Sequence, residues 1–345
     1  MQEVTFTLRV LTPLFLTGAD QTTAELRAPS FRGLMRYWYR ALVGGIVGAD
    51  GKTLQQVMKA ETTVFGATDT GSAVAVRVFG VSEKPKEFTE RTSINVGGKW
   101  QATGKGYLLW SMARNGSNER RNLKPARWFF PPGTTFRLTL SAHGEDDIKL
   151  KQAIAAFWLL INLGSVGSRS RRCAGSIAVS QPVENHDTDL SFETPADVEG
   201  LRRKLQQGIA VARSLYTRSP SQTKEDASFD ALSRNTSRIC ILQNGQRPWP
   251  TSEGAMEDIG ESLQAYRASV VPLWKRSIFG LPLKDVDNRA RRASPLLLRV
   301  VELQNKQYVG IAVLFKTISK DVATKDYALI EQWIATFPGK VEVTL

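Results

Sequence analysis

The residues with the clearest chemical capacity form a short basic loop at residues 164–177, which reads Gly-Ser-Val-Gly-Ser-Arg-Ser-Arg-Arg-Cys-Ala-Gly-Ser-Ile. Glycine lets the backbone take positive φ and approach a ligand closely, and arginine holds phosphate with paired N–H donors. The loop lacks the Gly-Lys-Ser/Thr ending of a P-loop, and it follows a predicted helix instead of opening one, which excludes the dinucleotide fingerprint. This composition predicts binding of a polyanion, and a surface turn with solvated arginines is the alternative. The candidate binding residues are Gly164, Gly167, Ser168, Arg169, Ser170, Arg171 and Arg172.

A second group of arginines lies on the first predicted helix, at residues 31–43 with Ser30 as its N-cap. Arginines recur there at intervals of four, which places three guanidinium groups on one helix face. No acidic residue stands four positions away to pair with them, so the face is predicted to contact RNA, and an ordinary solvated face is the alternative. The candidates are Arg27, Arg32, Arg36 and Arg40, with Tyr37 available to stack on bases.

A third basic segment, residues 284–294, is predicted as a loop and carries Arg289, Arg291 and Arg292. We expect Arg36 and Arg40 to meet the arginines of the glycine-rich loop, because both helices are predicted to pack on the same sheet face. The third segment is then expected to extend this basic patch from the C-terminal half.

The composition favours an acidic partner. The chain has 345 residues and a formal net charge of +13, with a pI near 9.8, which favours nucleic acid first and an anionic membrane second. No apolar run is long enough to span a bilayer, and the alternating N-terminus is not typical of a secretory signal. The two cysteines predict a reducing cytoplasm. The two histidines leave little room for a zinc site or a histidine-paired catalytic centre.

The order of predicted elements indicates an α+β protein with two tandem ferredoxin-like (RRM-like, βαββαβ) domains that carry insertions. The N-terminal domain, residues 1–190, has strand, helix, strand, strand, helix and strand at 5–10, 31–43, 73–79, 135–141, 146–163 and 177–179. The glycine-rich loop joins the last helix to the last strand. Residues 82–105 are predicted as an insertion or hairpin, and 107–112 as a short strand.

The C-terminal domain, residues 191–345, repeats this order after a bridging helix that begins at Thr194. Its strands and helices are predicted at 237–242, 253–279, 296–301, 308–315, 323–337 and 341–345, with Pro272 breaking the first of these helices. We expect the two halves to pack face to face.

Three further segments identify a family resemblance. Residues 12–20 read Thr-Pro-Leu-Phe-Leu-Thr-Gly-Ala-Asp, and residues 25–42 read Glu-Leu-Arg-Ala-Pro-Ser-Phe-Arg-Gly-Leu-Met-Arg-Tyr-Trp-Tyr-Arg-Ala-Leu. Residues 291–296 read Arg-Arg-Ala-Ser-Pro-Leu and follow Phe-Gly-Leu-Pro. With the glycine-rich loop, these segments resemble the RAMP superfamily of CRISPR proteins, and their combination resembles the first-numbered RAMP subunit of type III-B, or Cmr, effectors. Cys173 and Ala174 depart from the pattern, which has a more glycine-like pair there.

The resemblance implies a non-catalytic, cytoplasmic subunit of an antiviral ribonucleoprotein. Such a subunit would contribute to binding of the crRNA 3′ region and of target RNA, would contact other RAMP subunits, and would need no cofactor, metal or membrane. Cleavage of target RNA in these effectors belongs to the repeated backbone subunit, so no catalytic residue is implied here.

Two alternatives stay open. A RAMP-type, metal-independent endoribonuclease that processes crRNA would need a general acid and base, for which the candidates are His143, His186 and Asp20. All three residues are more typical of surfaces and turns. An enzyme that binds a phosphorylated metabolite is supported only by the glycine-rich loop.

Overall fold

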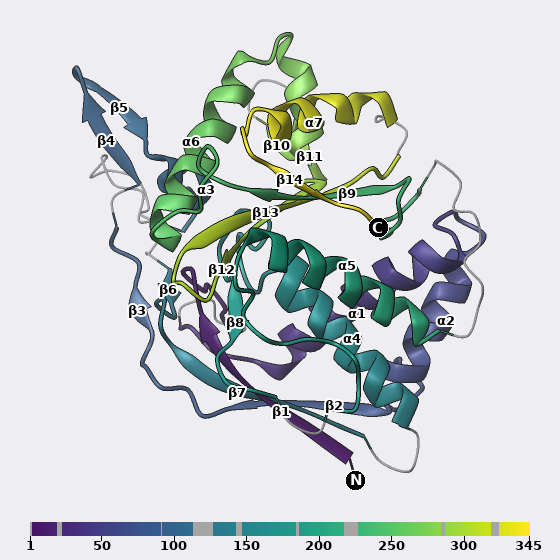
Figure 1. Cartoon of the computed structure of the whole chain (residues 1–345). Coiled ribbons are helices and arrows are strands. Elements are labelled where there is room, and N and C mark those ends of the chain that lie inside the picture. Colours follow the sequence, from purple (N-terminus) through teal and green to yellow (C-terminus); the bar gives the residue numbers. More distant parts are fainter. Residues whose placement is uncertain are drawn as a thin grey trace.

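A computed structural model describes residues 2–18, 23–90, 92–112, 127–142, 147–183, 186–216, 227–283, 287–318 and 324–345. Two four-stranded antiparallel sheets organise these residues. Layers of sheet and helix alternate in Figure 1, with the helices of the N-terminal half between the two sheets. The protein therefore has mixed α and β structure in which both sheets are antiparallel, in agreement with the α+β prediction.

The first sheet contains β1 (Gln2–Val10), β2 (Val74–Phe79), β7 (Thr135–Ala142) and β8 (Ile177–Val179), in the order β2-β7-β1-β8. Alternate side chains of β1 are buried, as the period of a half-buried strand requires. Helices α1 (Ala28–Val47) and α4 (Asp147–Leu163) cover one face of this sheet (Figure 1). Nearly every side chain of α4 from its second turn onward is buried, because the helix is enclosed on all sides.

The second sheet contains β9 (Ser237–Leu242), β12 (Leu296–Glu302), β13 (Tyr308–Phe315) and β14 (Val341–Val343), in the order β12-β13-β9-β14. Numbered within each half, both sheets place the strands in the order second, third, first, fourth. One face of the second sheet packs on α6 (Ser252–Ser269) and α7 (Ala328–Ala335), and the other joins the core of the N-terminal half. Helix α5 (Val198–Ser214) lies against both α4 and β14, and so bridges the halves.

Smaller elements complete the described chain. They are α2 (Leu54–Phe65), β3 (Lys86–Glu87), β4 (Ser93–Val96), β5 (Lys99–Ala102), α3 (Gly104–Leu108), β6 (Trp128–Phe129), η1 (Leu273–Phe279), β10 (Leu281–Leu283), β11 (Asp287–Arg292) and η2 (Thr324–Tyr327). The hairpin of β4 and β5 projects from the body of the molecule (Figure 1). No described helix has the length and apolar character that a membrane span requires.

Several predicted boundaries are wrong for identifiable reasons. Helix α1 begins at Ala28 instead of after Ser30, because Pro29 suits the first helical turn, where its missing N–H is not needed. Residues 107–112, predicted as a strand, form the end of α3 and a turn. The basic segment at 284–294, predicted as a loop, contains strand β11, which pairs with β10. Helix α5 is capped by Asp197 instead of Thr194, with its carboxylate accepting from the Gly200 N–H.

A candidate nucleic-acid interface

The glycine-rich loop is fixed to both halves of the molecule. Gly167 has a φ of +87°, and a Cβ there would lie 2.3 Å from the Phe15 carbonyl oxygen, so only glycine fits. On the other side, the Cys173 N–H donates to the Leu298 carbonyl at 2.9 Å. Cys173 itself has a φ of 65°, which explains why a glycine-like residue is expected at this position. The loop is therefore held by contacts with both halves of the molecule. Burial raises the pKa of the Cys173 thiol to about 12.

The remaining glycine and serine candidates have mainly backbone roles. Gly164 is buried, and a Cβ there would lie 2.4 Å from the Trp38 indole nitrogen, so this glycine permits the contact between α1 and the end of α4. Ser168 is exposed, and its N–H donates to the Phe15 carbonyl at 2.7 Å. Ser170 is half-buried and lines the hollow described below.

Arg172 is a buried structural residue. Its guanidinium donates to the carbonyl oxygens of Leu296 and Phe279, each at 3.1 Å, and so attaches the loop to the C-terminal half. Burial lowers its pKa to about 9. Arg172 is predicted to contact RNA, but in the structure its guanidinium donates to carbonyl oxygens of the protein itself.

Arg169 and Arg171 are only partly buried. The Arg169 Nε donates to the Leu108 carbonyl at 2.6 Å, and burial lowers the pKa of this guanidinium. Arg171 donates to the Ser294 carbonyl, and its guanidinium carbon lies 5.6 Å from the ring centre of Tyr37. Its contact with a carboxylate, that of Asp230, is longer, at 3.5 Å.

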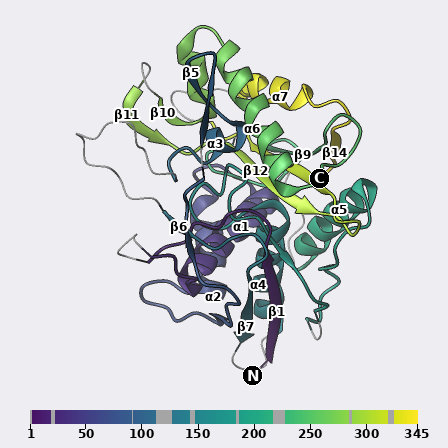
Figure 2. The ribbon, with the colours of Figure 1, turned by 90° about the vertical axis from the view of Figure 1, so that its left-hand side faces the viewer.

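These arginines line a hollow of about 750 Å³ together with Arg267 of α6 and Arg292 of β11. None of the described residues that line it is an aspartate or a glutamate. Figure 2 shows α3, α6, β10 and β11, the elements around this hollow, in the same part of the molecule. Five arginines from three chain segments, which are the glycine-rich loop, α6 and β11, thus surround one cavity without a carboxylate in its described lining. We call this cavity the arginine hollow.

Sequence reasoning missed two residues of the arginine hollow. Arg267 lies over the Phe279 ring at 5.5 Å and donates to the Tyr107 hydroxyl. Its Nε, like that of Arg292, is buried without a hydrogen-bond partner among the described residues. Trp110 is 54% exposed at the edge of the hollow. A lone arginine in the last turn of a helix and a tryptophan in a predicted strand give no sequence signal for a shared site.

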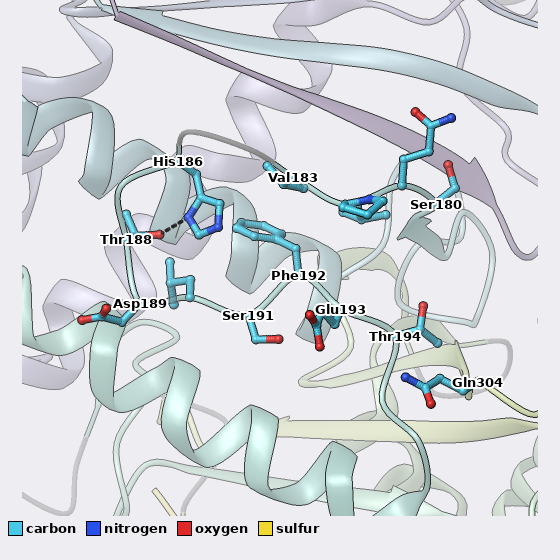
Figure 3. A pocket seen from close by; sticks show the side chains of 14 residues that line it. Ser180, Val183, His186, Thr188, Asp189, Ser191, Phe192, Glu193, Thr194 and Gln304 are labelled. Atoms are coloured by element: carbon cyan, nitrogen blue, oxygen red, sulfur yellow. Dashed lines mark hydrogen bonds between the residues drawn. The ribbon is translucent and has the colours of Figure 1, made fainter.

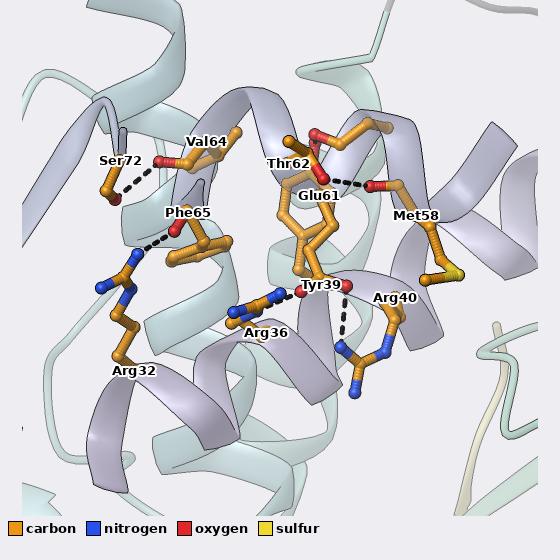
Figure 4. A network of polar contacts seen from close by, with 11 residues as sticks. Arg32, Arg36, Tyr39, Arg40, Met58, Glu61, Thr62, Val64, Phe65 and Ser72 are labelled. Atoms are coloured by element: carbon orange, nitrogen blue, oxygen red, sulfur yellow. Dashed lines mark hydrogen bonds and ion pairs between the residues drawn. The ribbon is translucent and has the colours of Figure 1, made fainter. Parts of the chain in front are cut away.

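The α1 arginines form a separate cluster with α2 (Figure 4). Arg36 donates to one carboxylate oxygen of Glu61, and Arg40 donates to the other at 2.7 Å. Glu61 is only 3% exposed, and Arg32 donates to the Phe65 carbonyl. The α1 arginines and the arginines of the glycine-rich loop, expected to form one patch, therefore form two separate clusters. The Glu61 carboxylate of α2 holds Arg36 and Arg40 on the outer face of α1.

The other predicted RNA-binding residues have mixed positions. Tyr37 joins the two clusters: its hydroxyl donates to Asp230 at 2.7 Å, and burial raises its pKa well above the usual value. Its ring faces Arg171 and is not free to stack on a base. Arg27 lies 3.7 Å from Glu25, and Arg291 is exposed on β11. The side chain of Arg289 lies outside the described residues.

A second hollow, of about 730 Å³, follows the segment between the halves (Figure 3). The His186 Nδ1 lies 2.8 Å from the Thr188 hydroxyl, and its ring packs edge-on against Phe192. Asp189 and Glu193 line this hollow, and no arginine or lysine is among its described lining residues. Its charge is therefore unsuited to a polyanion. His143 and Asp20 lie outside the described residues.

The described residues contain no group of three or more His, Cys, Asp and Glu side chains arranged to hold a metal. The arginine lining of the hollow offers hydrogen-bond donors and positive charge toward an anion.

Comparison with known proteins identifies the family. A model described as the RAMP superfamily matches residues 7–178. The Cmr subunit Cmr1-1 of Pyrococcus furiosus is 30% identical over 310 residues, covering 87% of this chain and 84% of that protein. Cmr1-2 of the same organism is 33% identical over 191 residues, covering 52% of this chain and 96% of that protein. The chain therefore belongs to the RAMP superfamily and, within it, to the family of the Cmr1 subunits.

Solved structures agree with the fold. The apo crystal structure of Cmr1 from P. furiosus superposes with a TM-score of 0.68 at 24% identity, covering 100% of this chain and 99% of that one. A chain in the cryo-EM structure of the type III-B Cmr-beta complex bound to cognate target RNA gives 0.60 at 12% identity, with coverages of 96% and 99%. The resemblance drawn from the sequence motifs is confirmed.

Proposed function

We propose that this protein is a non-catalytic RNA-binding subunit of a type III-B, or Cmr, CRISPR effector in the cytoplasm. Its partners are crRNA near the 3′ region, target RNA and other RAMP subunits of the complex. Membership of the Cmr1 family supports the assembly, and the net charge of +13 supports an RNA partner. The observation that carries the proposal is the arginine hollow, with five arginines and no carboxylate in its described lining.

The architecture supports the same proposal. We infer two tandem ferredoxin-like domains, residues 1–190 and 191–345, because both sheets have the strand order second, third, first, fourth. The second domain includes the bridging helix α5. The glycine-rich loop precedes the edge strand β8 of the first domain and contacts β12 of the second, so the arginine hollow lies where the two domains meet.

RNA would bind in the arginine hollow through its phosphates. The arginines there are held largely by carbonyl oxygens, which orient the guanidinium groups without offsetting their charge. An entering strand would release counterions from its phosphates, so affinity would fall as salt rises. The α1 arginines would add a weaker contact, because Glu61 offsets part of their charge.

The alternative, a metal-independent endoribonuclease, has less support. His186 lies in a hollow lined by two acidic residues and by no basic residue among those described. A scissile phosphate would be repelled there, and His186 shares no hollow with the five arginines.

The test is binding of labelled single-stranded RNA by the double variant Arg267→Ala/Arg292→Ala. The expected result is a loss of at least about tenfold in affinity, and a salt slope flattened by about 0.7 for each phosphate contact removed. The double variant Lys52→Ala/Lys84→Ala changes net charge equally on exposed residues outside the hollow, and is expected to bind nearly as wild type.

Equal losses in the two double variants would overturn the site, because net charge alone would then account for binding. The same RNA should stay intact with and without divalent metal. Cleavage that disappears in His186→Ala would favour the nuclease instead. A thermal melt of each variant separates a lost contact from a lost fold.

A further inference from the structure

Trp110 is an exposed aromatic residue on a rigid support. Its side chain is 54% exposed, whereas its neighbour Leu109 is fully buried and Met112 is 7% exposed. The Met112 N–H donates to the Leu109 carbonyl at 2.8 Å, which closes a tight turn around the tryptophan. The exposure therefore belongs to the side chain, since the backbone that carries it is packed into the core.

Four hydrogen bonds fix this turn relative to the arginine hollow. The carboxylate of Glu257 on α6 accepts the N–H groups of Gly104 and Lys105 at 2.6 and 2.8 Å, which holds the start of α3. The Arg169 guanidinium donates to the carbonyl oxygens of Tyr107 and Leu108, which holds its end. Arg169 thus acts as a positioning residue, and Trp110 is held at the edge of the cavity in a defined place.

Trp110 differs from the other aromatic rings nearby. Arg267 lies over the rings of Tyr107 and Phe279, at 5.9 and 5.5 Å, and Arg171 lies over Tyr37 at 5.6 Å. Among the described residues, no guanidinium or ring is stacked on Trp110. The hollow therefore contains aromatic faces that the protein itself covers and one large face that is open to a ligand.

An open indole lies beside Arg267 and Arg292, which form no ion pair with a carboxylate among the described residues. This combination matches the chemistry of one unstacked nucleotide. Proteins bind single strands by stacking bases on aromatic side chains while basic residues follow the backbone. A double helix would not present a free base face to such a residue. The combination favours single-stranded RNA over duplex.

We propose that Trp110 stacks on one base of a single RNA strand whose neighbouring phosphates contact Arg267 and Arg292. This inference rests on the proposed function and adds to it the residue that receives a base. Tyr37, predicted to stack, is replaced in that role by Trp110. The contact would be tolerant of base identity, because every base has an aromatic face.

The test compares Trp110→Ala, Trp110→Phe and the control Trp274→Ala on single-stranded RNA. Trp274 is 61% exposed and does not line the hollow. We expect Trp110→Ala to weaken binding by about 5- to 100-fold, Trp110→Phe to keep most of the affinity, and Trp274→Ala to bind as wild type. The salt slope of Trp110→Ala should stay unchanged, because stacking releases no counterions.

A series of RNAs with one abasic position each supplies the second measurement. At the stacked position, the abasic RNA should bind wild type and Trp110→Ala equally, because the same contact is lost in both.

The inference is overturned if Trp110→Ala binds as wild type, if Trp274→Ala loses as much, or if no abasic position cancels the loss. If Trp110→Ala has no effect while Arg267→Ala/Arg292→Ala weakens binding, stacking is wrong and the proposed function stands. If neither variant weakens binding, the proposed function itself fails.

Discussion

The arginines of α1 and the arginines of the hollow have different partners. On α1, Arg36 and Arg40 share the buried carboxylate of Glu61. In the hollow, Arg169 donates to the Leu108 carbonyl and Arg172 to the Leu296 carbonyl. A carboxylate offsets the charge that it orients, whereas a carbonyl orients the guanidinium and leaves its charge in place.

One residue type therefore serves packing in one place and ligand binding in another. The Glu61 contact fixes α2 on α1 and leaves a small net positive charge on that face. The carbonyl contacts of the hollow also fix the fold, but they keep positive charge in a cavity whose described lining contains no acidic residue. Binding of a polyanion is therefore expected to depend more on the hollow than on the α1 face.

We expect the largest effect, a loss of stability, from removal of the buried Arg172 side chain of the hollow. Arg172→Ala removes a side chain that is 8% exposed and leaves the Leu296 and Phe279 carbonyls without this donor. We expect a loss of about 3 kcal/mol in the free energy of unfolding, because each buried unpaired polar group costs about 1–3 kcal/mol. Urea or thermal unfolding measures it.

The matched control is Arg171→Ala, on the same loop. Its side chain is 27% exposed, so we expect a stability loss under about 1 kcal/mol together with weaker RNA binding. A stable Arg172→Ala protein with a flatter salt slope would show that Arg172 contacts phosphate, and the division between structural and binding arginines would be wrong.

A smaller loss of stability is expected when the α1 arginines lose their carboxylate partner, as in Glu61→Gln. Glu61→Gln keeps the shape of the side chain but removes its charge from Arg36 and Arg40. We expect a loss of about 1–2 kcal/mol in stability, less than for a fully buried pair because both arginines are about a third exposed. RNA affinity at low salt should rise slightly, and the gain should vanish at high salt.

Glu199→Gln is the control for this change. Glu199 also lies between two arginines, Arg202 at 2.5 Å and Arg203 at 3.7 Å, but on the exposed face of α5. Its loss should leave both stability and RNA affinity nearly unchanged, because solvent screens this exposed pair. A fall in RNA affinity in Glu61→Gln without unfolding would contradict the assignment of Glu61 as a charge-offsetting partner.

The parts of the fold that depend on local pattern were predictable. The α4 helix, the loop and strand β8 follow from the change of apolar period between residues 147 and 179. The glycine-like character expected at Cys173 agrees with its positive φ. The strands β9, β12 and β13 were likewise predicted, with small differences in their ends.

The candidate site was harder, because its determinants are distant in sequence. The spacing of residues along α1 reports only partners on the same helix, whereas Glu61, which pairs with Arg36 and Arg40, lies on α2. The turn at Trp110 depends on Gly104, where a Cβ would lie 1.8 Å from the Glu257 carbonyl oxygen of α6. No local pattern reports such a contact, so the sequence of residues 107–112 predicts a strand and does not predict the hollow.

The smallest expected effect is on the pH dependence of stability and comes from His186, which, unlike an arginine, can lose its proton near neutral pH. The His186 ring packs on Phe192, and its Nδ1 lies beside the Thr188 hydroxyl. Burial lowers the pKa of His186, and the nearby carboxylate of Asp187 raises it by less. A guanidinium in neutral surroundings keeps its charge, whereas this imidazole is expected to become neutral.

The consequence is a weak dependence of stability on pH near 6. Because the folded pKa is depressed, the unfolded chain binds more protons as pH falls through about 6.5, the ordinary value for histidine, and stability falls with it. The loss should stay well under about 1 kcal/mol, since solvent screens a partly exposed ring.

Urea unfolding of wild type and His186→Gln at pH 7.5 and 5.5 measures the difference, and the variant should lose this part of the pH dependence. A wild type that instead gains stability on acidification, with the gain absent in His186→Gln, would mean that Asp187 outweighs burial and that His186 is held as a cation.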